Sequence, residues 1–181
     1  DIDDCFGSLD HETLLGLLQH EVADEMVMGL MRAWLKGPQN GDAEMRRRGD
    51  AGTPEVPGKA GEGRGIALGM PISPLWANLY LHEMDWRLVR NRWPLVRYAD
   101  DFVLPVASPE VGERALEVVA RALADLKLQL EPTKTRVSSF EEGFTFLGVH
   151  FQGDEYTFTW QQKRVRVEGK ADVHAGWIGR A

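Results

Sequence analysis

Apolar residues recur at helical spacing in three stretches of the chain. The first stretch follows Asp10, which has the residue type of a helix N-cap and precedes one long apolar stripe. The second begins at Ser73-Pro74, a cap residue followed by proline at the first helical position, and predicts a helix to about Arg90. The third repeats that start signal at Ser108-Pro109-Glu110. We expect the first and third stripes to face the core; they consist of Leu14, Leu17, Leu18, Val22, Met26, Leu30, Met31 and Trp34, and of Val111, Ala115, Val118, Val119, Ala122, Leu123 and Leu126.

The remaining apolar runs have the short spacing of β-strands. Pro94–Tyr98 and Phe102–Val106 flank Ala99-Asp100-Asp101, which predicts a β-hairpin around an acidic turn. From Leu128 onward, apolar and polar residues alternate in short runs, which indicates antiparallel strands. Residues 1–6 are expected to be extended, and the residues after Gly169 carry little pattern. The expected fold is therefore α+β, a small antiparallel sheet with helices packed on one face.

Composition narrows the class of protein. The 181 residues are 43% apolar and 27% charged, which fits one globular domain or one domain with an appendage. Cys5 is the single cysteine, so neither an internal disulfide nor a cysteine zinc cage can form. No apolar run is long enough for a membrane span. Because the first residue is Asp rather than Met, we expect a fragment or a processed product.

Residues 37–65 interrupt the periodic pattern. They hold eight glycines, three prolines and the triplet Arg46-Arg47-Arg48, which predicts a long loop. The triplet is either a solvated loop charge or a phosphate contact.

The net charge of −7 is unevenly distributed. Residues 1–31 hold eight acidic residues and no Lys or Arg, whereas the rest of the chain holds 20 acidic and 21 basic residues. Asp1, Asp3 and Asp4 stand in the first four positions. Such a cluster is either a solvated terminus or a cation site.

A second acidic cluster lies at the predicted hairpin, where Asp100 and Asp101 are adjacent. An Asp pair alone is common in turns, because the side chain caps local N–H groups. Here, however, the flanking apolar residues Val96, Tyr98, Phe102 and Leu104 are expected to bury the hairpin. Two buried carboxylates repel each other unless a cation lies between them. A third carboxylate would complete an oxygen site for Mg²⁺, and two such ions about 4 Å apart serve phosphoryl or nucleotidyl transfer.

The segment Gly65–Pro74 leads into the second predicted helix. It can be read as a glycine-rich loop and nothing more. In a functional interpretation, Gly69 lets the backbone pass close to a substrate, and the helix N-terminus behind it favours phosphate.

Five segments, in this order, resemble the motifs of reverse transcriptases of the group II intron and retron type. They span residues 1 to about 150, which the resemblance identifies as a polymerase palm without its upstream fingers. Residues 151–181 are then a short β-rich appendage or the start of a following domain, not a recognisable thumb. The segments are Asp1-Ile2-x-x-x-Phe6 with Leu9-Asp10-His11; Gly69-x-Pro71-Ile72-Ser73-Pro74-Leu75-x-Ala77-Asn78-Leu79-Tyr80-Leu81; Arg97-Tyr98-Ala99-Asp100-Asp101-Phe102; Leu128-x-Leu130-x-Pro132-x-Lys134-Thr135; and Phe146-Leu147-Gly148.

The resemblance implies a role for each matched position. Asp1, Asp100 and Asp101 would hold two Mg²⁺ ions, or Mn²⁺ in their place, with the Ile2 carbonyl as a further ligand. Lys134 would act as a general acid near the leaving pyrophosphate, although its residue type also suits a solvated strand end. The remaining roles are nucleotide binding by Asp3, Asp4, Cys5, Phe6, Gly69 and Met70, with Phe6 as steric gate, and a primer grip of Phe146, Leu147 and Gly148.

The function implied is RNA-directed DNA polymerisation in the cytoplasm of a bacterial or archaeal cell. The partners would be an RNA template, a DNA primer and deoxynucleoside triphosphates, with no membrane. The stretch 139–144 and the basic ending resemble reverse transcriptases fused to CRISPR adaptation integrases, and the rival is a free-standing or intron-encoded enzyme. Three departures from the family pattern favour an alternative, a palm relic that binds nucleic acid or a partner without chemistry. Leu68 replaces the usual Gln, Gly7 replaces the usual Asp, and the upstream fingers are missing. A nucleotide cyclase is disfavoured because its hairpin motif differs from Tyr98-Ala99-Asp100-Asp101.

Overall fold

The computed structural model describes residues 1–36, 63–67, 69–160, 163–168 and 177–180. Most of the predicted loop at residues 37–65, with its arginine triplet, and Leu68 lie outside the described residues. Contacts divide the chain into two units. The sheet unit comprises Asp1–Asp3, Met84–Ala124 and Gln129–Ala181, and the helical unit comprises Asp4–Glu83 and Asp125–Leu128.

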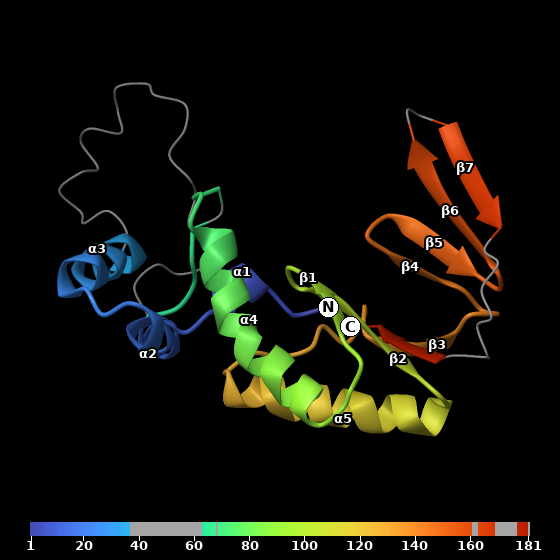
Figure 1. Ribbon diagram of the computed structural model, residues 1–181, viewed down its shortest axis with the longest axis horizontal. Helices are drawn as coiled ribbons and strands as arrows, with labels where there is room; N and C mark the ends of the chain where they lie inside the picture. Colours follow the sequence, from blue (N-terminus) through green and yellow to red (C-terminus); the bar gives the residue numbers. More distant parts are fainter. Residues whose placement is uncertain (37–62, 68, 161–162, 169–176, 181) are drawn as a thin grey trace. The chain divides into compact units, whose positions relative to one another are not determined.

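The helical unit contains α1 (Cys5–Ser8), α2 (His11–Glu21), α3 (Glu25–Lys36) and the first part of α4 (Ser73–Arg90) (Figure 1). Asp10 caps α2 as predicted, because its side chain accepts a hydrogen bond from Thr13 N at 2.9 Å. The prediction of one long first helix is wrong. The chain leaves the helical conformation at Val22, and Asp24 Oδ1 starts α3 by accepting from Met26 N at 2.8 Å.

The break between α2 and α3 also explains which apolar residues are buried. Leu14, Leu18 and Met28 lie in the core, but Met26 is 84% exposed and Leu30 and Trp34 are exposed as well. The prediction of one continuous buried stripe is therefore wrong for α3. A break in the helix lets the second half rotate about its own axis, so the spacing of the first half no longer sets its buried face.

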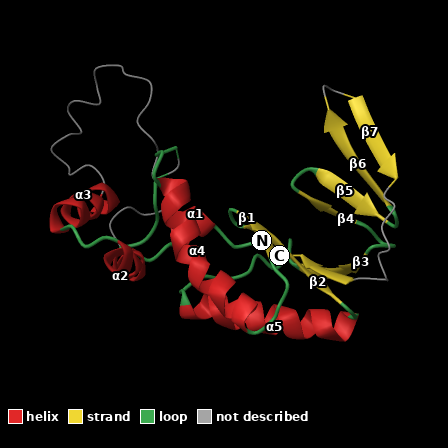
Figure 2. Cartoon of the chain, in the orientation of Figure 1, coloured by secondary structure: helices red, strands yellow, loops and turns green. Residues whose placement is uncertain are grey.

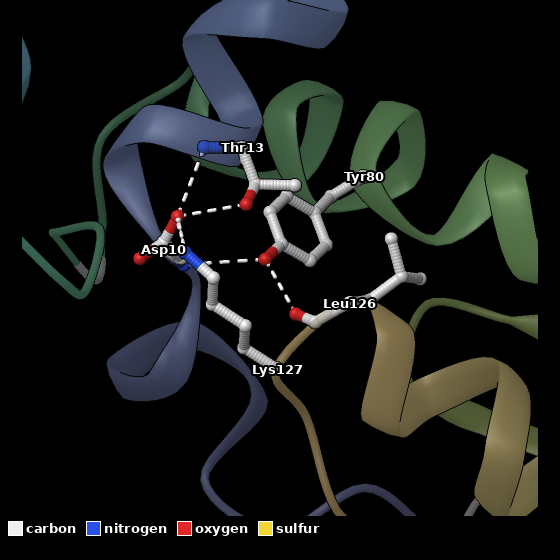
Figure 3. Close-up of polar contacts among 5 residues, drawn as sticks. All are labelled: Asp10, Thr13, Tyr80, Leu126 and Lys127. Atoms are coloured by element: carbon white, nitrogen blue, oxygen red, sulfur yellow. Dashed lines mark hydrogen bonds and ion pairs between the residues drawn. The ribbon is translucent and has the colours of Figure 1, made fainter.

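A polar network joins three segments of the helical unit (Figure 3). The Lys127 ammonium lies 2.8 Å from Asp10 Oδ1, which also accepts from the Thr13 hydroxyl at 2.7 Å. The buried Tyr80 hydroxyl donates to the Leu126 carbonyl at 2.6 Å and accepts from Asp10 N at 3.4 Å. The start of α2, the middle of α4 and the residues after α5 are thereby held together.

The charge of Asp10 depends on these partners. Burial alone would raise the pKa of this carboxyl, but hydrogen bonds from Lys127 and Thr13 outweigh burial and lower the pKa from 3.8 to about 2. The carboxylate is therefore better stabilised in the folded chain than in the unfolded chain. The pKa of Lys127 is raised, chiefly by its hydrogen bond to Asp10.

Two predicted starts need correction. α4 covers Ser73–Arg90, as expected, but the Ser73 hydroxyl donates to the Ala67 carbonyl at 2.6 Å and is not the N-cap acceptor that we predicted. The opening stretch is extended only at its beginning, because α1 starts at Cys5. The glycine-rich segment and the first motif are otherwise where the sequence placed them.

The sheet unit is built on β1 (Val96–Tyr98), β2 (Asp101–Val106), β3 (Arg136–Ser139) and β8 (Trp177–Arg180) (Figure 2). Their order is β1-β2-β8-β3, with every pair antiparallel. The weakly patterned tail thus supplies an inner strand, which the sequence analysis missed. The predicted hairpin is present, although its turn is Ala99-Asp100 and Asp101 already belongs to β2.

Helix α5 (Pro109–Asp125) runs along one side of this sheet (Figure 1). Its predicted stripe is buried at Ala115, Val119, Ala122 and Leu123. At Gly112 the helix comes so close to β3 that a Cβ would lie 2.7 Å from Val137 Cγ1, so any larger residue would have to displace the Val137 side chain.

A second antiparallel sheet follows β3 along the chain. It consists of β4 (Phe144–Phe146), β5 (Val149–Gln152), β6 (Glu155–Trp160) and β7 (Lys163–Glu168) in the order β4-β5-β6-β7. Phe144 and Phe151 stack at 5.1 Å between ring centroids, and Phe144 packs with Val103 of β2 in a common core. The α+β class is confirmed. The predicted domain boundary after residue 150 falls within β5, and the division into palm and appendage stays a prediction.

Among the described residues, no helix has the length and apolar content needed to cross a bilayer.

The Asp10 network predicts a specific acid sensitivity. A group with a depressed pKa in the folded state contributes stability above its unfolded pKa, and the contribution disappears as pH falls through the folded pKa. Asp10 should therefore contribute constantly above pH 3.8 and lose its contribution between pH 3.8 and about 2. The loss should be about 1 kcal/mol once solvent screening around the partly exposed Lys127 is included. Urea unfolding across this pH range measures it.

The matched variants are Lys127→Gln and Arg121→Gln. Lys127→Gln should lower the free energy of unfolding at pH 7 and flatten its dependence on pH below 4, because Asp10 loses its cation. Arg121 pairs with Glu117 on the exposed surface of α5, so its variant should leave both quantities within about 0.5 kcal/mol. Identical pH profiles for Lys127→Gln and the unmodified chain would contradict the assignment.

Candidate active site

The first three residues form an extended strand end in the sheet unit. Ile2 makes an antiparallel bridge to Leu130, Asp3 N donates to the Gln129 carbonyl at 3.0 Å, and Glu131 N donates to the Asp1 carbonyl at 3.0 Å. Because side chains alternate along an extended chain, Ile2 enters the core and the acidic side chains of its neighbours point to the other face. The first and fourth motifs are therefore paired through backbone hydrogen bonds, which the sequence analysis did not predict.

This pairing brings Lys134 to Asp1. The Lys134 ammonium lies 2.7 Å from Asp1 Oδ2. The lysine lies within a turn in which Thr135 N donates to the Glu131 carbonyl at 3.0 Å and the Glu131 carboxylate accepts from Thr133 Oγ1 at 2.7 Å. The hydrogen bond from the Thr133 side chain lowers the pKa of Glu131. Two predicted catalytic residues are thus in direct contact in this structure.

The Asp100-Asp101 pair lies at the turn of the β1–β2 hairpin. Arg97 braces this turn: its guanidinium contacts Asp85 in a bidentate pair at 2.8 and 2.5 Å, and Nη1 donates to the Ala99 carbonyl at 2.7 Å. Asp85 comes from the end of α4, and the sequence analysis missed its role. An Asp 12 residues before the arginine of the motif was the only available signal.

The hairpin is buried on one strand only. Phe102 and Leu104 of β2 are buried as predicted, but Val96 is exposed and Tyr98 is 67% exposed, so the expectation of a fully buried hairpin is wrong. The physical reason is that β1 is an edge strand, whereas β2 has neighbours on both sides. Asp100 and Asp101 are half-buried.

The acidic residues have the donor chemistry for a divalent cation. Carboxylate oxygens are the ligands that Mg²⁺ prefers, and Asp1 already binds one cation, the ammonium of Lys134. Within the part of the chain that the structure describes, no three Asp, Glu, His or Cys side chains are grouped as a metal site. The metal-binding role of Asp1, Ile2, Asp100 and Asp101 stays a prediction.

The predicted nucleotide-binding residues divide between the units. Asp3 belongs to the sheet unit, whereas Asp4, Cys5, Phe6, Gly69 and Met70 belong to the helical unit. There the glycine-rich segment runs beside the first motif, because Ile66 N donates to the Phe6 carbonyl and Gly65 N to the Leu9 carbonyl, each at 2.8 Å. Phe6 is half-buried and Cys5 is buried.

Gly69 lies just before α4. Its φ of 84° is a conformation that favours glycine, and the Met70 carbonyl accepts from Ser73 N at 3.1 Å at the helix start. The roles of Gly69 and Met70 in nucleotide binding stay predictions.

Gly7 departs from the family pattern, and the structure gives a physical context for it. Asp4 has a φ of 37°, and its carboxylate lies so close to Gly7 that a Cβ there would collide with it. A side chain at position 7 would therefore have to displace Asp4, which supplies a carboxylate beside that position.

The predicted primer-grip residues form the turn between β4 and β5. Phe146 pairs with Val149 across the hairpin, and Leu147 and Gly148 have φ values of 50° and 77°. Leu147 is exposed at the tip of this turn. Beyond the turn, the polar face of the second sheet contains a hollow of about 540 Å³, lined by His150, Gln152, Glu155, Thr157 and Arg166. The primer-grip role itself stays a prediction.

Comparisons with known proteins agree with the motif order. Residues 1–151 match the family described as reverse transcriptase (RNA-dependent DNA polymerase). Protein YkfC of Escherichia coli (strain K12) is 27% identical over 82% of this chain and 44% of its own length. The group II intron-encoded protein LtrA of Lactococcus lactis subsp. cremoris is 29% identical over 58% of this chain and 15% of its own length. The chain therefore spans less than half the length of these curated relatives.

The family match covers all five motif segments named above, including the Asp100-Asp101 hairpin and the strand that carries Asp1. The CRISPR-associated subgroup has no support among these relatives. The chain belongs to the reverse transcriptase family.

Proposed function

We propose that this chain is the palm of an RNA-directed DNA polymerase that transfers nucleotides onto a primer 3′-OH by a two-metal-ion mechanism. The contact that carries the proposal is the pair between Asp1 and Lys134, two residues from motifs that lie 133 positions apart and meet at 2.7 Å. The braced Asp100-Asp101 turn in the same unit supports it. The family match gives the reaction class.

In the proposed mechanism, Asp1, Asp100 and Asp101 would hold the metal ions, with the Ile2 carbonyl as an additional donor. When bound, Mg²⁺ would offset negative charge on the triphosphate and on the attacking oxygen. Arg97 keeps the aspartate turn in place through Asp85 and the Ala99 carbonyl. Lys134 provides a proton to the leaving pyrophosphate once its ammonium leaves Asp1.

The proposed substrates follow from this chemistry. They are deoxynucleoside triphosphates, an RNA template and a DNA primer, with Phe6 next to the incoming sugar and the β4–β5 turn against the primer strand. Similarity to an intron-encoded protein supports a mobile-element context in a bacterial cytoplasm. A CRISPR adaptation protein with a fused or associated integrase is the other context, and it rests on the resemblance of residues 139–144 and the basic ending alone.

A second candidate function is a palm relic that binds nucleic acid or a partner without chemistry. One observation favours it: position 7 is a glycine with Asp4 beside it. The two candidates differ in metal binding. Calorimetry should detect Mg²⁺ binding that depends on Asp1 and Asp100 in a working palm, and none in a relic.

The first prediction concerns the acidic turn. Asp100→Asn in the natural full-length protein should lower primer extension on an RNA template by about 10²–10³-fold, because a charged group at the reacting phosphate is lost. The measurement is gel-resolved extension at saturating Mg²⁺. Asp154→Asn is the matched control, since Asp154 is an exposed aspartate in the β5–β6 turn. Equal extension by Asp100→Asn and Asp154→Asn would refute the polymerase proposal.

The second prediction concerns Lys134. Its replacement by Gln should strengthen Mg²⁺ binding and slow nucleotide transfer. Lys134→Gln removes the cation that competes for Asp1, so Mg²⁺ should bind several-fold more tightly. The same variant should slow extension by about 10²-fold, because the general acid is lost. Calorimetry and single-turnover extension measure the two effects. Lys134→Arg should retain the competition for Asp1 without restoring the rate, since an arginine does not release its proton.

A Lys134→Gln variant with unchanged Mg²⁺ affinity and an unchanged rate would show that Lys134 is a solvated strand-end lysine.

A further inference from the structure

The C-terminal end of α4 carries a dense positive charge that the catalytic proposal does not use. The eight residues from Trp86 to Trp93 contain Arg87, Arg90 and Arg92 and no acidic residue, in a chain whose net charge is −7. All three arginines lie on the exposed surface of the sheet unit. The nearest acidic residue on the helix, Asp85, forms a bidentate pair with Arg97.

An exposed aromatic ring lies within this basic stretch. Trp86 is 47% exposed, and the Arg90 guanidinium carbon lies 5.2 Å from the centroid of its indole ring. A guanidinium over an indole is held in position without losing its hydrogen-bond donors, which lie in its own plane. Arg90 is therefore presented to solvent at a lower entropic cost than a freely rotating arginine.

Helix stability alone explains part of this charge. Cations in the last turn of a helix offset the partial negative charge of the unpaired carbonyl groups, and Arg87 and Arg90 occupy the last turn of α4. This explanation does not extend to Arg92, which lies beyond the helix.

Arg92 occupies a position where glycine is preferred. Arg92 N donates to the Val89 carbonyl and Trp93 N to the Leu88 carbonyl, each at 2.9 Å, which is the hydrogen-bond pattern of a Schellman motif. In this motif the residue at position 92 takes the left-handed conformation, and Arg92 has a φ of 61°. A side chain in this conformation is strained, and glycine relieves the strain. The chain has arginine there, with its side chain on the exposed surface.

We propose that the end of α4 binds the phosphate backbone of an RNA strand through Arg90 and Arg92. An anionic polymer is a ligand that complements closely spaced, exposed arginines in a stretch, residues 86–93, that holds no acidic residue. The choice of RNA over DNA rests on the proposed function, which requires an RNA template.

Arg92→Gly tests the proposal, because a structural role and a binding role predict opposite results. Glycine removes the strain at position 92, so the thermal midpoint of the full chain should rise by about 2 °C or more. The same variant should weaken binding of a fluorescein-labelled oligouridine RNA about three- to ten-fold. The slope of log K against log[KCl] should become shallower by about 0.7–1, the value for one lost phosphate contact on a single strand. Fluorescence anisotropy over a series of KCl concentrations measures both.

Arg121→Gln is the matched control, because it also removes one exposed arginine from the sheet unit. It should leave both the affinity and the salt slope unchanged. Arg92→Gly with unchanged affinity, an equal loss in Arg121→Gln, or no RNA binding by the unmodified chain would each overturn the proposal. The same measurement is made with oligodeoxyuridine of the same length. If Arg92→Gly weakens binding of this DNA alone, the assignment to RNA is wrong.

Binding is measured separately from catalysis, so failure of one proposal is distinguishable from failure of the other. Normal extension by Asp100→Asn would refute the polymerase proposal and, with it, the choice of RNA as the ligand of α4. Arg92→Gly with unchanged RNA affinity, while Asp100→Asn lowers extension, would overturn the α4 proposal alone.

Discussion

The short antiparallel pairing between residues 1–3 and residues 129–131 is the constraint on which the candidate site depends. It uses backbone hydrogen bonds, Asp3 N to Gln129 O and Glu131 N to Asp1 O, so it does not require the acidic side chains. One apolar residue of this strand, Ile2, is buried and anchors it to the core. The acidic side chains are consequently left for other partners. Because Leu130 is bridged to Ile2, Lys134 lies only four residues along the chain from this pairing and reaches Asp1.

Three aspartates in different parts of the chain each contact a basic side chain that offsets their charge. Lys134 contacts Asp1, Lys127 contacts Asp10, and Arg97 contacts Asp85. Each pair joins residues distant in sequence or in different elements, so each one fixes a tertiary arrangement as well as offsetting a charge. Hydrogen bonds from Lys127 and Thr13 lower the pKa of Asp10 to about 2. The two lysines differ in exposure, since the Lys127 side chain is 45% exposed and the Lys134 side chain is 63% exposed, so solvent screens the Lys134 ammonium more. The net charge of −7 therefore says little about the local fields at these sites.

Local signals in the sequence predicted local structure well. Ser-Pro starts gave the positions of α4 and α5, the Asp10 cap gave α2, and the apolar runs around Asp100 gave the β1–β2 hairpin. Relations between distant segments could not be predicted, because no local periodicity encodes them. Examples are the pairing of Lys127 with Asp10, 117 residues apart, and the insertion of β8 between β2 and β3. The candidate site came from the order of five motifs, and its Asp1–Lys134 contact needed the tertiary structure.

Positive φ values at non-glycine residues occur in segments of the chain that the motifs and the surface charge also single out. Among the described residues, the non-glycine residues with positive φ are Asp4, Arg92, Ala99, Lys127 and Leu147. Asp4 lies in the first motif, Ala99 beside the acidic pair, and Leu147 at the predicted primer grip, while Lys127 pairs with Asp10 and Arg92 ends α4. Each such residue costs of order 1 kcal/mol where glycine would cost less. Described glycines take positive φ at other turns, among them Gly69, Gly143 and Gly148. The non-glycine positions with positive φ fall in the predicted site, in the Lys127–Asp10 pair of the helical unit and at the basic end of α4, so the local backbone cost is borne in segments that also carry charge or a motif.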